Sequence, residues 1–251
     1  MEKSSQMGKN RTGMDMSPMH SKAMISGAEE YQDMGDTNGH SMALIDRQYI
    51  SEADPIGSVP VPGTLRGALK SGMKKVAGHN PEVFLNKLGE RLAFERTGVR
   101  LYESVITKCE AADESHPVEP VTVEELRRIR NEEAEHFRLL KDAMESMGAD
   151  PTAQTPDADI SGVAAMGIQH VLNDPRTSMS QSLEMLLTLE LTDNAAWEML
   201  IKLADDLGLE ELVAQFQHAL AQEEDHIRVV RSWYETMIMS QAAKAPPAGS
   251  H

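Results

Sequence analysis

The chain of 251 residues has little of what several protein classes require. Its single cysteine, Cys109, excludes an internal disulfide framework and a four-cysteine metal site of the rubredoxin type. Aromatic residues make up only 4% of the sequence, and valine and isoleucine are sparse beside leucine, alanine, methionine and glutamate. This composition favours helices over sheets.

Long apolar segments are also missing from the sequence. No apolar run approaches the roughly 20 residues that a membrane-spanning helix needs. The N-terminal sequence MEKSSQMGKN has no apolar segment of the kind that a secretory signal contains. Together with the lone cysteine, these features predict a protein of the reducing cytoplasm that has no membrane partner.

Negative charge is unevenly distributed along the chain. Residues 1–80 contain equal numbers of basic and acidic side chains, so the net charge of −16 belongs to residues 81–251. An acidic body repels the phosphates of nucleic acids and of anionic lipids. The charge therefore argues against nucleic acid as a partner.

Residues 1–80 are predicted to be an N-terminal extension and linker. Nearly half of the 17 methionines lie in residues 1–54, among Gly, Ser, Asp and His, without a sustained hydrophobic period. The stretch 55–63, PIGSVPVPG, is typical of an extended linker, and a short basic helix is expected at 64–76. The extension is therefore expected to be mostly irregular, and a disordered tail is expected at 244–251.

Four long helical patterns, each with a capping signal or a glycine break, fill most of the remaining chain. Their expected spans are 81–110, 122–148, 178–207 and 210–243. The first follows the N-cap Asn80 and starts with a proline, and the second opens with a capping box from Thr122 to Glu125. Short connections join the first pattern to the second and the third to the fourth, so each pair is expected to form an antiparallel hairpin.

The segment 149–177 connects the two hairpins and includes a short helical pattern at 159–172. Two hairpins joined by one long crossover are typical of the ferritin-like four-helix bundle. The sequence therefore predicts an all-α fold, in which residues 81–243 form such a bundle.

Each of the four patterns has an apolar seam at steps of three and four residues. Near the middle of every seam the apolar residues give way to glutamate, and in two of them also to histidine. These six residues are Glu95, Glu133, His136, Glu190, Glu223 and His226. Four ionised carboxylates in one apolar core would be very costly without neutralisation. Two divalent cations would balance their charge, and oxygen and imidazole ligands suit Fe(II) or Mn(II).

The six residues also repeat in a way that indicates a pseudo-twofold axis. The second and fourth helical patterns each carry Glu-x-x-His, and the first and third each carry a glutamate followed seven residues later by an aromatic residue. These aromatic residues are Tyr102 and Trp197. Tyr102 is a candidate for a redox-active or hydrogen-bonding phenol beside the site, and an ordinary core tyrosine is the alternative.

Several residues close to the six are alternatives or candidate neighbours. Glu132 with His136 is a second register for the metal ligands, and Glu90 is a less favoured ligand because it falls off the seam. The acids that flank the ligands are expected to lie on solvated faces, with one of them as a candidate for a hydrogen bond to the far nitrogen of a ligand histidine; they are Glu132, Glu135, Glu224 and Asp225. Asp193 and Asn194 are candidates for contacts with the ligands.

This pattern resembles that of the ferritin-like diiron-carboxylate superfamily, which includes bacterioferritin and rubrerythrin. The stretch LGERLAFERTGVRLYE at 88–103 is also similar to a widespread group of bacterial ferritin-like proteins. The resemblance implies that Glu95 and Glu190 are terminal ligands, one for each metal ion. It implies that Glu133 and Glu223 bridge the two ions and that each histidine binds one of them. The chain differs in having no rubredoxin module, a long N-terminal extension and a longer crossover.

The resemblance also implies a function at such a site. A diferrous centre passes electrons to O2 or H2O2, so we expect a diiron oxidoreductase that oxidises Fe(II) or reduces peroxide or O2. The alternatives are an iron-binding or storage protein with little turnover, a dimanganese enzyme similar to catalase, and a hydroxylase of an organic substrate. The implied cofactor is two iron ions, or manganese. The implied partners are metal ions, O2 or H2O2, and further copies of the chain in a homo-oligomer.

Overall fold

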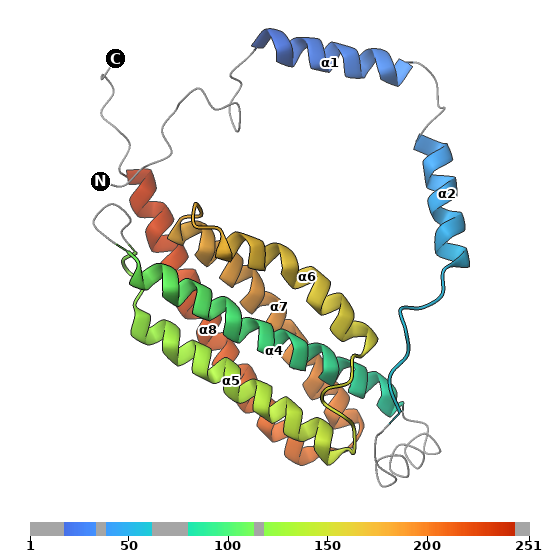
Figure 1. Ribbon diagram of the computed structural model, residues 1–251, viewed down its shortest axis with the longest axis vertical. Coiled ribbons are helices and arrows are strands. Elements are labelled where there is room, and N and C mark those ends of the chain that lie inside the picture. The colour runs from blue at the N-terminus through green and yellow to red at the C-terminus, as the bar shows by residue number, and fades with distance from the viewer. Residues whose placement is uncertain (1–17, 34–38, 62–79, 113–117, 244–251) are drawn as a thin grey trace. The chain divides into compact units, whose positions relative to one another are not determined.

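The computed structural model describes residues 18–33, 39–61, 80–112 and 118–243, and all regular elements in these ranges are helices (Figure 1). The helices are α1 (Pro18–Asp33), α2 (Gly39–Glu52), α4 (Pro81–Glu110), α5 (Val123–Ser146), α6 (Pro156–Asn173), α7 (Met179–Asp206) and α8 (Glu210–Ala243). The prediction of an all-α fold is confirmed for this part of the chain. None of these helices has both the length and the apolar character that crossing a bilayer requires.

The chain divides into two units, of which one contains α1 and α2 and the other contains α4 to α8. The sequence pattern predicts a mostly irregular extension at 1–80, whereas the structure has two helices there. Both segments contain residues of good helix propensity, such as Ala, Met, Gln and Glu, which favour a helix locally. The basic helix expected at 64–76 and the tail expected at 244–251 lie outside the described residues.

Side-chain caps fix the beginnings of α4, α5 and α7. The N-caps are Asn80, Thr122 and Ser178, and each accepts a hydrogen bond through its side chain from a backbone N–H in the first turn. Such a bond satisfies one of the backbone donors that the start of a helix leaves unpaired. The predicted starts after Asn80 and Thr122, and the predicted end of the first helix at Glu110, are confirmed.

A glycine turn joins α7 to α8. Gly208 has a φ of +64°, a left-handed conformation that favours glycine because glycine has no Cβ. The predicted break at this residue and the predicted span of the last helix, 210–243, are both confirmed. The short helix expected at 159–172 is longer than predicted, because Thr155 caps it and Pro156 occupies its first turn.

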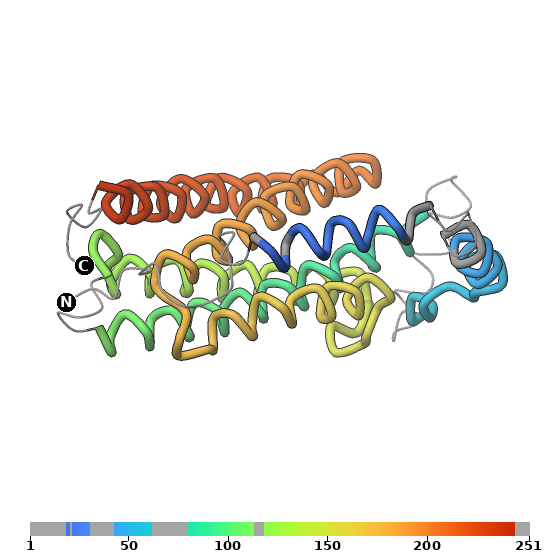
Figure 2. The backbone as a smooth tube through the Cα atoms, turned by 90° about the horizontal axis from the view of Figure 1, so that it is seen from above, coloured from blue at the N-terminus to red at the C-terminus, as the bar shows by residue number. Residues whose placement is uncertain are grey.

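The helices α4 to α8 pack against one another to form one helical core (Figure 1). The helix α5 runs back along α4, and α8 runs back along α7. Contacts between α4 and α7 and between α5 and α8 join these two pairs. The remaining helix, α6, lies against α4 and α7, which a second view of the backbone also shows (Figure 2).

Buried apolar side chains form two clusters in this core, one toward each end of the helices. On α4, Leu88 and Leu92 belong to one cluster, while Leu101 and Val105 belong to the other. The helices α5, α7 and α8 divide between the two clusters in the same way. On all four helices the predicted metal ligands lie between the two apolar sections, so the core contains a polar layer enclosed by apolar halves.

Substitution of Gly208 by alanine is expected to lower the free energy of unfolding by about 1 kcal/mol. In the described part of the chain no atom lies within 4 Å of a Cβ built at this position, so the cost is conformational rather than steric. Gly162, in the middle of α6, has equally open space, and alanine there is expected to raise stability by up to about 1 kcal/mol. Urea denaturation of both variants measures the difference, and equal effects of the two substitutions would contradict this account.

Candidate metal centre

Six side chains from four helices meet in the polar layer of the core. They are Glu95 from α4, Glu133 and His136 from α5, Glu190 from α7, and Glu223 and His226 from α8. Each of the six is between 0% and 2% exposed. The structure thus brings together all the residues that the sequence pattern indicates as metal ligands.

The six residues form two overlapping groups. The His136 group consists of Glu95, Glu133, His136 and Glu223, and the His226 group consists of Glu133, Glu190, Glu223 and His226. Within each group, one ligand atom from every residue lies within 4.8 Å of the others. Because Glu133 and Glu223 belong to both groups, the two sets of donor atoms are adjacent and share two carboxylates, and each set could hold a metal ion.

Eight oxygen and nitrogen atoms of these residues are buried and have no hydrogen-bond partner among the described residues outside the six, although Nδ1 of His136 lies 2.8 Å from Oε1 of Glu223 within the site. They are both carboxylate oxygens of Glu133 and of Glu223, Oε2 of Glu95 and of Glu190, and Nδ1 of His136 and of His226. A buried polar atom without a partner costs about 1–3 kcal/mol, so such atoms are rare unless something binds them. Oxygen and imidazole nitrogen donors together suit divalent metal ions such as Fe(II) and Mn(II). The residues therefore fit a dinuclear metal site.

Glu95 and Glu190 each belong to only one of the two groups. In each of them, one carboxylate oxygen accepts a hydrogen bond from a residue outside the six. Arg91 Nη2 donates to Oε1 of Glu95 at 2.8 Å, and the Tyr102 hydroxyl donates to Oε1 of Glu190. The other oxygen of each carboxylate, Oε2, is free and lies 3.8 Å and 3.6 Å, respectively, from Nδ1 of the histidine in its group. Each of these glutamates thus offers one oxygen to a cation, as a terminal ligand does.

Both histidines direct Nδ1 into the site and hold Nε2 on its outer side. Nε2 of His136 lies 3.0 Å from Oε1 of Gln222, and Nε2 of His226 lies 2.7 Å from Oε2 of Glu132. An acceptor at Nε2 keeps the ring proton there and leaves Nδ1 as the metal-binding atom. The predicted hydrogen bond between an acidic neighbour and the far nitrogen of a histidine is confirmed at Glu132.

The two alternative ligands that the sequence suggested have other partners. Glu132 contacts His226 from the outer side and also pairs with Arg128 at 2.6 Å. Glu90 pairs with Lys87 at 2.7 Å at the surface of α4. Neither carboxylate belongs to the two groups of ligand atoms, so the geometry favours the predicted register.

A buried arginine beside the site is not predicted by the sequence pattern. Arg91 is 1% exposed, and its Nη2 atom contacts carboxylate oxygens of both Glu95 and Asp193. Its guanidinium also lies over the ring of Phe94, 4.1 Å from the ring centroid. The spacing of four residues between Arg91 and Glu95 is the only sequence signal for this contact. Asp193 therefore acts on the site through Arg91, whereas Asn194 is only partly buried.

The aromatic residues at corresponding positions of α4 and α7 are both fully buried beside the site. Tyr102 holds Glu190, and burial together with the charge of Glu190 raises the pKa of the phenol well above its usual value. Trp197 packs edge-on against His136, with 5.5 Å between the ring centroids. Tyr102 thus has the hydrogen-bonding role that was one of its expected roles, and a redox role stays a prediction.

A glycine gives the Glu133 carboxylate the space that it occupies. A Cβ built at Gly98 would lie only 2.6 Å from Oε2 of Glu133, so a larger residue would displace this carboxylate. The sequence pattern does not predict this role. Gly98 follows Glu95 by three residues, whereas Asp193 occupies the corresponding position on α7, three residues after Glu190. This difference between the two repeats is the signal that the sequence contains.

Burial and mutual charge set the protonation of the site before a cation binds. Burial, together with the charges of Glu223 and Glu95, raises the pKa of Glu133 well above its usual range. Burial also opposes the ionisation of Glu223, but the two histidines outweigh burial and lower its pKa. Glu223 and Glu95 in turn outweigh burial and raise the pKa of His136 to about 11. The polar layer therefore holds protonated histidines between ionised and protonated carboxyl groups.

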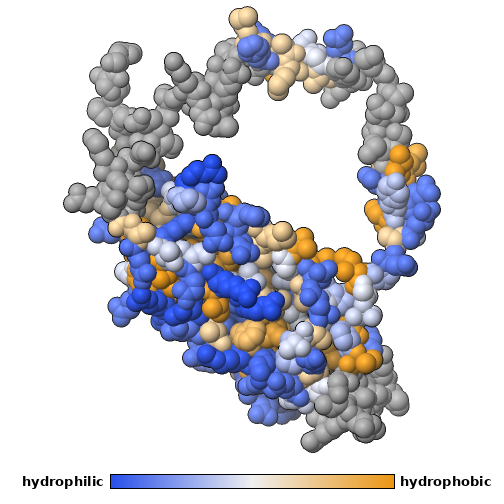
Figure 3. Space-filling model, viewed as in Figure 1, coloured by the Kyte–Doolittle hydropathy of each residue, from blue (hydrophilic) through white to orange (hydrophobic). Residues whose placement is uncertain are grey.

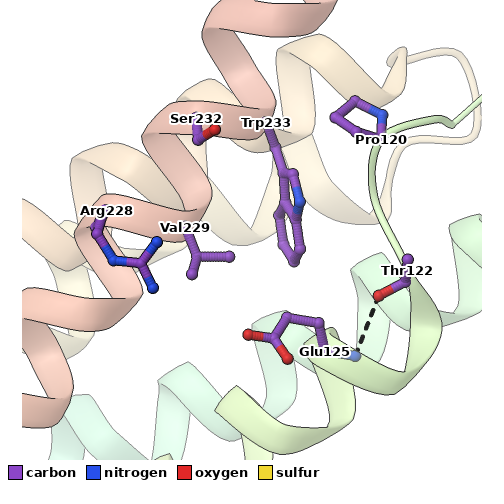
Figure 4. A pocket seen from close by; sticks show the side chains of 7 residues that line it. All are labelled: Pro120, Thr122, Glu125, Arg228, Val229, Ser232 and Trp233. Carbon is purple, nitrogen blue, oxygen red and sulfur yellow. Dashed lines mark hydrogen bonds between the residues drawn. The ribbon is translucent and has the colours of Figure 1, made fainter.

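A surface pocket lies where α5 begins, and none of the six site residues lines it. Its volume is about 340 Å³, and it is lined by Pro120, Thr122, Glu125, Arg228, Val229, Ser232 and Trp233 (Figure 4). The ring of Trp233 faces the first turn of α5 there. Elsewhere the visible face of the core mixes hydrophilic and hydrophobic side chains (Figure 3). The nearly complete burial of the site residues restricts access to ions and very small molecules unless the helices move.

No family model, no curated protein and no solved structure matches the chain. The ferritin-like resemblance therefore rests on the sequence pattern itself, which consists of the two Glu-x-x-His pairs and the two single glutamates. The case for a metal centre rests on the geometry described above.

Glu133→Gln and Glu223→Gln are expected to have unequal effects on the metal-free protein at pH 7. The raised pKa of Glu133 makes it a neutral acid, which glutamine mimics, so its substitution should change the free energy of unfolding by less than about 1 kcal/mol. Glu223 is ionised between two histidines, and glutamine there should cost about 3 kcal/mol. Urea denaturation in the presence of a chelator measures both values. Equal losses would contradict the protonation pattern.

Metal affinity is expected to rise with pH between about 6 and 8. The pKa of His136 is raised to about 11 and that of Glu190 to about 7, so protons occupy atoms that a metal ion would bind. Each proton that a cation displaces should increase the apparent affinity about tenfold per pH unit while the group is protonated. Calorimetric titration with Zn(II) in buffers of different ionisation enthalpy counts the protons released. An affinity that is independent of pH, without proton release, would contradict this expectation.

Proposed function

We propose that this protein is a dinuclear non-haem iron protein that oxidises Fe(II) or reduces H2O2 or O2 at the four-glutamate, two-histidine site. The observation that carries the proposal is the set of eight buried donor atoms that face one another and have no hydrogen-bond partner among the described residues outside the six. Hydrogen bonds hold the outer atoms of the histidines and of the two terminal glutamates, while the inner atoms converge.

Charge supports two divalent cations rather than one. The four glutamates carry up to four negative charges, and neither shared carboxylate has a hydrogen-bond partner among the described residues outside the six. The nearby arginines already have other acidic partners, since Arg91 is shared with Asp193 and Arg128 with Glu125 and Asp225. Two divalent cations would therefore bring the layer close to neutrality, which removes most of the cost of burying the carboxylates.

The proposed ligand assignment follows the two groups. Glu95 and His136 would hold one iron, Glu190 and His226 would hold the other, and the two carboxylates common to both groups would bridge the pair. The proposed topology is the ferritin-like four-helix bundle. Its support is that each pair of sequential helices, α4 with α5 and α7 with α8, packs together and that the segment containing α6 connects the pairs.

Bound iron would supply two electrons, one from each Fe(II) ion, to a small oxidant. Reduction of one H2O2 by two Fe(II) consumes two protons and yields two waters and two Fe(III), whereas the two-electron reduction of O2 yields H2O2. The protein would hold the ligands in place and exclude bulk water through the two apolar clusters on either side. The protonated Tyr102 hydroxyl would keep its hydrogen bond to Glu190 Oε1, which leaves Oε2 as the ligand atom.

Burial of the site favours small oxidants over an organic substrate. All six residues are at most 2% exposed, and the surface pocket is lined by other residues. The donor set suits Mn(II) as well as Fe(II), so a dimanganese site with catalase activity is the second candidate. Evolution of O2 from H2O2 by the manganese-loaded protein would favour that candidate.

The test of the proposed function is the consumption of oxidant by protein loaded anaerobically with Fe(II). The loaded protein is expected to consume H2O2 or O2 at least about tenfold faster than free Fe(II) at the same pH. Glu133→Gln removes one shared carboxylate and should reduce the rate to that of free iron. Glu135→Gln makes the same charge change at an exposed position of α5 and should retain the wild-type rate. Wild-type protein that consumes neither oxidant faster than free iron would contradict the proposal.

A further inference from the structure

The outer partners of the two histidines occupy equivalent positions on α5 and α8. Glu132 immediately precedes Glu133, and Gln222 immediately precedes Glu223. Each of these outer residues contacts Nε2 of the histidine on the opposite helix, Glu132 that of His226 and Gln222 that of His136. These two contacts between α5 and α8 are related by the pseudo-twofold repeat. The partners differ chemically, however, because Glu132 is an acid and Gln222 is an amide.

The Glu132 carboxylate is held as an anion by a fixed arginine. Arg128 donates to it through Nη1 at 2.6 Å, and Arg128 Nη2 contacts Glu125 at 2.7 Å and Asp225 at 2.8 Å. Glu132 in turn lies 2.7 Å from His226 Nε2 and is largely covered, with 18% of its side chain exposed. The same ion network therefore fixes both the position and the charge of this hydrogen-bond acceptor.

The two acceptors should make the two histidines unequal as ligands. A carboxylate that accepts the Nε2–H bond makes the imidazole a stronger electron donor at Nδ1 than a neutral amide does. Nδ1 of His226 should therefore bind a cation more tightly than Nδ1 of His136. Partners of this kind change metal affinity by about 10–100-fold when they are substituted.

The terminal glutamates are unequal in the same direction. Oε1 of Glu95 accepts from the guanidinium of Arg91, whereas Oε1 of Glu190 accepts from the neutral phenol of Tyr102. A full positive charge 2.8 Å from Glu95 reduces the charge that its carboxylate offers to a cation. Asp193 shares Arg91 and offsets part of this effect. The difference between the histidines and the difference between the terminal glutamates both favour tighter cation binding by the His226 group.

We propose that the His226 group is a tight subsite that is filled first by a divalent first-row metal ion, and that the His136 group is a weaker, exchangeable subsite. This inference rests on the proposed metal-binding function and adds an order to it. The resident ion would occupy the His226 group. Substrate Fe(II) would enter and leave through the His136 group.

The test is calorimetric titration of metal-free, full-length protein with Zn(II), which binds without redox chemistry. Wild-type protein is expected to bind two ions in separate steps whose affinities differ by at least about tenfold. His136→Ala should retain the tight step, and His226→Ala should retain only the weak one. Circular dichroism confirms that each variant is helical before its titration.

Exchange of the outer partners tests the cause of the difference. Glu132→Gln should weaken the tight step about tenfold, and Gln222→Glu should strengthen the weak step, so that each variant brings the two affinities closer. In the His136→Ala background, Glu132→Gln should still weaken binding, while Gln222→Glu should have no effect. Glu135→Gln, an exposed residue on α5 with the same charge change, is the matched control and should leave both steps unchanged.

The outcomes separate this inference from the proposed function. Two Zn(II) ions bound with equal affinity, or a Glu132→Gln variant that binds like wild type, would overturn the inference while the metal site stands. A tight step that is lost in His136→Ala and kept in His226→Ala would overturn it as well, because the order would be reversed. Failure of wild-type protein to bind any Zn(II) would overturn the proposed function and the inference together.

Discussion

Four carboxylates enclosed by an apolar core are the constraint on which the rest of this structure depends. Each must be neutralised by a proton, by a cationic side chain or by a bound cation, because an unpaired buried charge costs several kcal/mol. Arg91 is the one buried arginine beside them among the described residues, and it is shared with Asp193. The histidines supply further positive charge only while they are protonated. Two divalent cations would meet the whole requirement at once.

Neighbouring side chains satisfy the outer atoms of the site, whereas its inner atoms face only one another. Tyr102, Gln222 and Glu132 each contact the outer atom of a ligand, and the caps and apolar clusters of the four helices fix the positions from which they do so. Ligands held in this way lose little entropy when a cation binds. The pseudo-twofold repeat supplies two similar halves, and the outer contacts make these halves chemically different.

Much of the helical framework could be predicted because its signals are local. Asn80 and Thr122 cap their helices as expected, and Gly208 ends α7 as expected. The six glutamates and histidines could be singled out because they interrupt an otherwise apolar period. Arg91 and Gln222 could not, since their roles depend on which side chain of a neighbouring helix they meet. The helices α1 and α2 are not predicted by the sequence pattern, because they are short and lie among Gly, Ser and Asp residues that favour irregular structure.

The most direct test of the central claim is the metal content per chain of protein purified without added metal, measured by inductively coupled plasma mass spectrometry. We expect at least one tightly held iron or manganese ion per chain as purified, about two after anaerobic loading, and none in the Glu133→Ala/Glu223→Ala variant, which lacks both shared carboxylates. A wild-type chain that holds no transition metal, even after anaerobic loading with Fe(II) or Mn(II), would contradict it.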